Sequence, residues 1–137
     1  MYRVERAQRN IVQLGLGDEV ISIRVGGLAV WKKYIEAQER LLDIQKKLEA
    51  YGKEKKEAPV ELMTLLGDTI VYIFQLLFGE DNTKKIVEFF EGEYDEMFSA
   101  LLPFITKELI PKIRETAKTD SEQMAKRIAG DVPSESE

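Results

Sequence analysis

The chain has 137 residues, of which 44% are apolar and 33% are charged. This is enough apolar material for one folded domain, and it argues against a collagen-like or wholly disordered chain. The sequence contains no cysteine and no histidine, which excludes disulfides, thiolate metal sites, cysteine nucleophiles and imidazole chemistry within it. The formal net charge of −5 disfavours a duplex nucleic-acid binder, because such proteins usually carry a basic surplus.

Residues 1–27 differ from the rest of the chain and are predicted to form an N-terminal β element. Apolar and polar residues alternate in their second half, and the apolar face is made of Ile21, Ile23 and Val25. This period of two is typical of a half-buried strand. Residues 15–18 have the composition of a turn, which makes residues 10–14 the expected hairpin partner. A helix stays open as an alternative, since helical spacing also relates Val4, Ala7, Ile11 and Leu14.

The pattern then changes to that of a long amphipathic helix from Leu28 to about Lys56. Its apolar residues follow alternating spacings of four and three: Val30, Tyr34, Ala37, Leu41, Ile44, Leu48 and Tyr51. We call this set the heptad stripe. Trp31, Ile35 and Leu42 widen it, and the opposite side is rich in lysine and glutamate.

A second helix is expected from Val60 to Phe78, and it is apolar over most of its circumference. It is about as long as a membrane span, but it contains Glu61 and Asp68, and carboxylates are costly in the middle of a bilayer. We therefore expect the central helix of a soluble, cytoplasmic bundle, with no membrane partner.

A shorter helix is expected over residues 83–91, with Asp81 or Asn82 as its N-cap. Its expected buried side consists of Ile86, Val87, Phe89 and Phe90.

A final helical stretch begins near Tyr94 or Asp95. Pro103 and Pro111 interrupt it, which predicts either a kinked helix or two helices broken near the Leu102-Pro103 bond. The apolar pattern weakens after Ala117, so residues 28–117 are the predicted helical domain. Residues 118–137 are predicted to be weakly ordered, with only a faint stripe of Met124 and Ile128 and a polar, disordered end. The predicted fold class is thus mainly α: a helical bundle with a long amphipathic helix and a small N-terminal β-hairpin or strand.

Few side chains point to chemistry. Glu91, Glu93, Asp95 and Glu96 form the densest carboxylate cluster. Such a cluster can hold a hard cation, but acidic residues at a helix start also stabilise the helix dipole, and we favour that interpretation. Residues 79–85 are a poor match to a calcium loop, and residues 15–17 are too short for a dinucleotide-binding turn. The phenylalanines could line a pocket, but their helical spacing favours a core: Phe74, Phe78, Phe89, Phe90, Phe98 and Phe104. We assign no catalytic, cofactor-binding or metal-binding residue.

The heptad stripe is the most informative feature. Packing within the domain is one interpretation, and packing against another polypeptide is the other. The candidate interaction residues are Val30, Tyr34, Leu41, Ile44, Leu48 and Tyr51. Charge is also uneven, because residues 1–57 carry +3 and residues 58–106 carry −7, so the two parts could attract each other within one chain or between copies.

Residues 78–97 read FGEDNTKKIVEFFEGEYDEM and run into Leu102-Pro103-Phe104-Ile105 and Ile110-Pro111-Lys112-Ile113. Together with the preceding Gly17-Asp18-Glu19-Val20-Ile21 segment, long charged helix and apolar helix, this pattern resembles the tail assembly chaperones of siphophages and prophages of Gram-positive bacteria. The resemblance covers roughly residues 15–115.

The resemblance implies a non-enzymatic protein without a cofactor, acting in the host cytoplasm. It implies several copies that bind and solubilise the long tape-measure protein and help to recruit tail-tube subunits. In this family a frameshifted longer form often supplies the tube-binding part. Two other functions stay open: a structural or adaptor protein of the tail or virion, and a small helical ligand-binding or regulatory protein.

Overall fold

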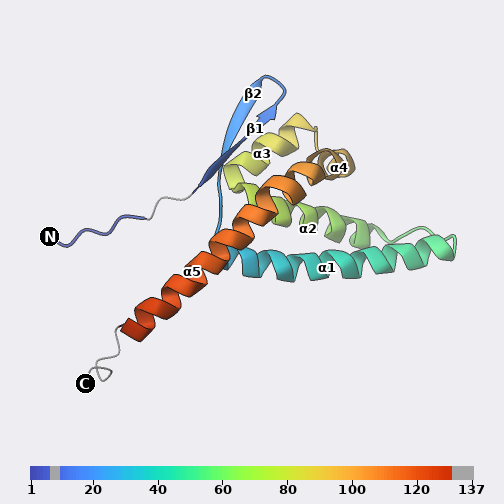
Figure 1. Cartoon of the computed structure of the whole chain (residues 1–137). Helices are drawn as coiled ribbons and strands as arrows, with labels where there is room; N and C mark the ends of the chain where they lie inside the picture. Colours follow the sequence, from blue (N-terminus) through green and yellow to red (C-terminus); the bar gives the residue numbers. More distant parts are fainter. Residues whose placement is uncertain (7–9, 131–137) are drawn as a thin grey trace.

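The computed structural model describes residues 1–6 and 10–130 (Figure 1). In chain order the elements are β1 (Ile11–Leu16), β2 (Glu19–Arg24), α1 (Leu28–Lys53), α2 (Val60–Phe78), α3 (Glu80–Phe89), α4 (Tyr94–Phe104), the π-helical turn η1 (Ile105–Leu109) and α5 (Ile110–Gly130). The predicted fold class is therefore confirmed: the described chain is mainly α and starts with a small β-hairpin.

The hairpin is an antiparallel pair in which Val12 lies opposite Ile23 and Leu14 lies opposite Ile21. These pairs form its inner face, since apolar residues that face each other across two strands pack together. The strand interpretation of the N-terminal segment was thus correct and the helical alternative was wrong. The turn is shorter than predicted, because β1 continues through Leu16 and the chain reverses at Gly17, whose φ of +61° suits a glycine.

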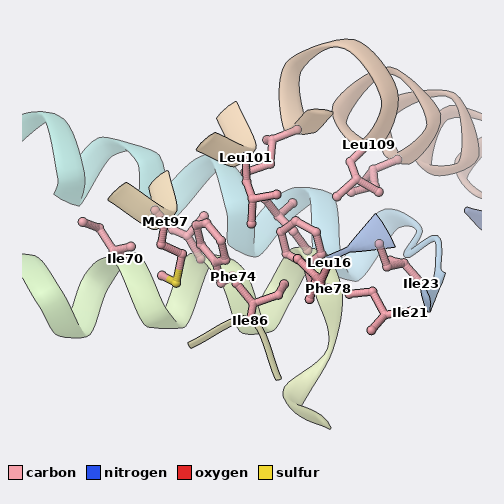
Figure 2. Packing of buried hydrophobic residues seen from close by; sticks show 14 of the residues in the cluster. Leu16, Ile21, Ile23, Ile70, Phe74, Phe78, Ile86, Met97, Leu101 and Leu109 are labelled. Carbon is pink, nitrogen blue, oxygen red and sulfur yellow. The ribbon is translucent and has the colours of Figure 1, made fainter. Parts of the chain in front are cut away.

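Polar contacts and apolar packing both hold the hairpin to the helices. The Lys85 side-chain nitrogen of α3 lies 3.6 Å from a Glu19 carboxylate oxygen of β2. The Asn82 side-chain nitrogen donates to the Ser22 carbonyl oxygen at 2.8 Å and to the Phe78 carbonyl oxygen at 2.9 Å. Figure 2 shows Ile21, Ile23 and Leu16 gathered near Phe78, at one end of the apolar core. The hairpin therefore caps one end of the helical core.

Helices α1 and α2 pack side by side as an antiparallel pair (Figure 1). The buried residues of α1 are Ala37 and Ile44, both from the heptad stripe. The Arg40 guanidinium lies 5.7 Å from the centre of the Tyr72 ring and adds a cation–π contact across the pair. Helix α1 ends at Lys53, slightly earlier than the sequence pattern suggests.

The two halves of α2 differ in burial. Its C-terminal half lies in the core, where Phe74, Leu77 and Phe78 are at most 2% exposed, and Figure 2 shows Met97 and Ile86 close to the Phe74 ring. Its N-terminal half is open, with Val60 70% exposed and other apolar residues about half exposed. Among the described residues, α2 is the one helix that length and composition would allow to cross a membrane, and 33% of its most apolar window is buried. The predicted central position therefore applies to its C-terminal half.

Helix α3 begins at Glu80, three residues before the predicted start. The predicted N-caps were wrong, because Gly79 takes a φ of +89° and separates α2 from α3 on its own, which places Asp81 and Asn82 inside the helix. Phe89 was expected to be buried but is 50% exposed, stacked edge-on against Phe90.

The prolines change the helix type without ending the helix. Pro103 lies inside α4, and the backbone then continues as the π-helical turn η1. Pro111 has no N–H to complete an α-helical bond, and the Ile110 N–H just before it reaches back to the Ile105 carbonyl oxygen. Of the two predicted alternatives, the kinked helix is therefore correct and the break at the Leu102-Pro103 bond is wrong. The helix continues through a π turn, and Figure 1 shows α4 and α5 running in different directions.

Helix α5 packs on α1 and runs on through Gly130. The domain boundary predicted at residue 118 therefore falls inside a helix, whose last ten residues are exposed. The polar end predicted to be disordered, residues 131–137, lies outside the described residues.

Candidate functional site

The two halves of α1 have different surroundings. Its N-terminal half lies against α5, where the Arg114 guanidinium sits 5.7 Å from the centre of the Trp31 ring. At the very start of α1 the Leu28 N–H donates to an Asp120 carboxylate oxygen at 3.3 Å. Because α5 runs antiparallel to α1 between these two contacts, it moves away from the C-terminal half of α1. That half, with its part of the heptad stripe, is left beside α2 and α4.

A groove of about 490 Å³ opens where α1, α2 and α4 meet. We call it the groove, and its lining residues are Leu41, Gln45 and Leu48 of α1, Met63, Leu66, Gly67 and Ile70 of α2, and Tyr94, Asp95, Phe98, Ser99 and Leu102 of α4. Three helices thus supply its walls.

The groove walls are apolar and accessible to solvent. Met63 is 50% exposed, Leu102 43% and Tyr94 38%. On α1, Leu42 follows the lining residue Leu41 and is 52% exposed on a neighbouring side of the helix. A continuous apolar surface of this kind on a small protein usually marks a binding site for another molecule.

The close approach of α4 to α2 shapes one part of the groove. Gly67 is buried under the Tyr94 ring, and a Cβ atom at Gly67 would lie 2.9 Å from Tyr94 Cε2. A glycine is therefore needed for this contact in its present form, because any side chain would displace the ring.

The charges at the groove are negative. Asp95 is the one charged residue in the lining. Close to it in sequence, Glu91 and Glu93 just before α4 and Glu96 in its first turn are exposed. On α1 the Gln45 amide donates to Glu49 at 3.4 Å, which places a further carboxylate near the rim. The groove therefore favours an apolar ligand with basic flanks.

The sequence-predicted interaction residues separate into three environments. Leu41 and Leu48 line the groove. Ile44 is 3% exposed and does not line the groove. Tyr51 is half-buried and lies beside Leu62 and Leu65 near the end of α1.

Val30 and Tyr34 belong to the N-terminal half of α1 and pack against the apolar core. Both are half-buried, and burial raises the pKa of the Tyr34 hydroxyl above its ordinary value. The structure thus brings only part of the heptad stripe to the groove and uses the rest within the chain.

Sequence reasoning missed the groove residues outside α1. Met63 and Leu66 come from α2, and Phe98 and Leu102 come from α4. The apolar circumference of α2 was a usable signal, because a helix apolar on all sides has more apolar surface than one neighbour covers. The spacing of apolar residues did not predict that α4 packs beside α1 and α2.

The other candidate residues do not converge on a site. Within residues 1–6 and 10–130, no three acidic side chains are grouped so that they could hold a metal ion, and Asp95 and Glu96 lie in the first turn of α4. Residues 80–85 are helical rather than a loop. The phenylalanines mostly stack with each other in the core, as Phe74 and Phe78 do at 5.2 Å. Phe98 is the member of that set that lines the groove.

No family model, curated protein or solved structure matches the chain. The groove is therefore the strongest indication of function that the molecule offers.

Proposed function

We propose that the chain is a helix-binding chaperone of phage tail assembly, and that the groove is where it holds its client. The observation that carries the proposal is the groove itself, in which Met63 and Leu102 are large, apolar and about half exposed. Amphipathic helices commonly bind in apolar grooves between helices, with anchor residues spaced one turn apart.

The dimensions of the groove fit a short helical segment. Leu41 and Leu48 are seven residues apart on α1 and so about 10 Å apart along the axis, which matches roughly two turns of a bound helix. A client helix with apolar residues at positions i, i+3 or i+4, and i+7 could place each of them against the walls. The acidic rim favours clients whose flanking residues are basic or neutral.

The resemblance of residues 15–115 to tail assembly chaperones supports the choice of client. A tape-measure protein is long and helical and offers many apolar segments, and a chaperone must hold such segments reversibly. An open groove with a polar surround suits this task, since it shields apolar surface without enclosing it. The setting we propose is the host cytoplasm, with tail-tube subunits as the next partners.

Co-expression with a siphophage tape-measure protein tests the proposal. We expect the wild-type chain to keep that protein soluble, and Leu102→Glu to abolish the effect because a carboxylate then projects into the groove. Val20→Glu is the matched control, since Val20 is 62% exposed on β2 and does not line the groove. The proposal fails if the tape-measure protein precipitates equally with and without the wild-type chain.

A permanent tail component would use the same surface, so a second measurement is needed. Mass spectrometry of purified particles separates the two roles. A chaperone leaves as the tail polymerises and should be absent, whereas an adaptor should be present in a fixed copy number.

A further inference from the structure

The C-terminal part of α5 forms a second apolar surface, which is a projecting helix face and not a groove. Residues 121–130, which we call the arm, are all exposed. Met124 is 56% exposed and Ile128 is 59% exposed. They lie four residues apart and therefore on the same face of the helix.

The arm is lightly packed within the described residues, where Gln123, Met124 and Arg127 line an open cavity beside the start of α1. The arm continues α5 beyond the part that packs on α1, and it leaves Met124 and Ile128 more than half exposed to solvent. Arg127 lies beside this apolar face, whereas Glu122 and Lys126 lie on the opposite side of the helix. The arm thus has the features that the groove selects: apolar anchors one turn apart beside positive charge.

The arm cannot reach the groove of its own chain. Asp120, just before the arm, contacts the Leu28 N–H at the N-terminal end of α1. From there α5 continues away from the helical body (Figure 1), whereas the groove lies beside Leu41 and Leu48, about 20–30 Å further along α1 at 1.5 Å per residue.

We propose that the arm of one copy binds in the groove of a second copy. The arm is about 15 Å long, enough to follow the groove, in which Leu41 and Leu48 are about 10 Å apart along α1. Met124 and Ile128 would pack on the apolar walls, and Arg127 would lie close to the acidic rim around Asp95. This inference rests on the proposed function in one respect: the neighbour's arm is the resting occupant that a client helix displaces.

Such a contact is head-to-tail. Each copy offers its arm to one neighbour and its groove to another, so the two surfaces in a contact are different. Because each added copy leaves one arm and one groove free, assembly by such contacts continues beyond the dimer until a ring closes. The chain should therefore form open or closed series of copies whose size grows with concentration.

Sedimentation velocity of the full chain, over a hundredfold range of concentration, tests the proposal. We expect wild type and Val20→Glu to assemble beyond the dimer. The arm variant Met124→Glu/Ile128→Glu and the groove variant Leu102→Glu should each remain monomeric. Circular dichroism confirms that each variant is folded, and Leu102→Gln provides a milder groove variant if Leu102→Glu is not.

Mixing the two monomeric variants gives the sharper result. The arm variant retains an intact groove and the groove variant retains an intact arm, so an equimolar mixture should form one-to-one heterodimers that grow no further. If the arms instead pair with each other, the groove variant alone still dimerises, which overturns the proposal. Assembly of the arm variant at wild-type strength overturns it as well.

The two proposals fail separately. If the arm variant is monomeric but still keeps the tape-measure protein soluble, both proposals stand. If Leu102→Glu also keeps that protein soluble, the proposed client site is wrong while the arm contact is unaffected. If the arm variant still assembles, only the arm contact is wrong.

Discussion

The Tyr94 ring rests directly on Gly67, so that a Cβ atom on the glycine would lie 2.9 Å from the ring. This contact sets how closely the start of α4 approaches α2, and both residues line the groove. The width of the groove is therefore tied to the absence of a side chain at a single helical position.

A double-mutant cycle on this pair has a definite expected outcome. Replacing a helical glycine by alanine stabilises a helix by about 1 kcal/mol, but at Gly67 the new methyl group must displace Tyr94. We expect Gly67→Ala to be neutral or destabilising in wild type and stabilising by about 1 kcal/mol in the Tyr94→Ala background. Urea unfolding of the four proteins measures this. An identical effect in both backgrounds would show that the contact is unimportant.

The Asn82 amide should be important for attaching the hairpin. Asn82→Ala removes both hydrogen bonds, to Ser22 and to Phe78, and should lower the free energy of unfolding by about 1–2 kcal/mol. Asn82→Asp should be at least as harmful, because its carboxylate would face two carbonyl oxygens. Gln38→Ala, an exposed amide on α1, is the control and should change stability by less than about 0.5 kcal/mol. Equal losses for Asn82 and Gln38 would contradict the assignment.

The contact between Arg114 and Trp31 should contribute to the docking of α5 on α1. Arg114→Gln removes the cation above the ring and should cost about 0.5–1 kcal/mol, the range for an exposed cation–π pair. Trp31 is the only tryptophan in the chain, so its fluorescence follows this docking directly. Lys118→Gln removes the same charge one turn further along α5, and should leave the Trp31 emission unchanged.

Stability should fall at alkaline pH in a way that depends on Tyr34. Burial raises the pKa of the Tyr34 hydroxyl above its ordinary value of 10.0, so the folded state keeps this proton more tightly than the unfolded state. The corresponding stability is fully present below pH 10.0 and is lost as pH rises from there through the higher folded-state pKa. Tyr34→Phe should flatten this decline when unfolding is measured between about pH 9 and pH 11. Parallel curves for the two proteins would contradict the prediction.

Much of the fold was predictable because local patterns agreed with it. The alternation around Ile21 and Ile23 predicted a strand, and the four–three spacing of the heptad stripe predicted α1. Boundaries that depend on backbone geometry were not predictable in this way. Gly79 separates two helices without a capping side chain. The two prolines left a kink and a break equally open, and the π turn before Pro111 keeps the helix continuous.

The groove was only partly predictable. The heptad stripe supplied Leu41 and Leu48. Its spacing does not show, however, which residues of the stripe are covered by other helices and which stay accessible. That depends on the direction of α5, which is fixed by contacts such as Arg114 with Trp31, far apart in sequence. The exposed Met124 and Ile128 were visible as a weak stripe, and their helix was not expected to extend to Gly130.

Site-specific photocrosslinking from the groove tests the central claim most directly. A photoreactive phenylalanine analogue replaces Leu102 in the groove or, as a control, Val20 on the hairpin, during co-expression with the tape-measure protein. Groove binding predicts strong crosslinks to helical segments of the tape-measure protein from position 102 and only background from position 20. Background crosslinking from position 102, with the tape-measure protein still held soluble, would show that the client binds elsewhere.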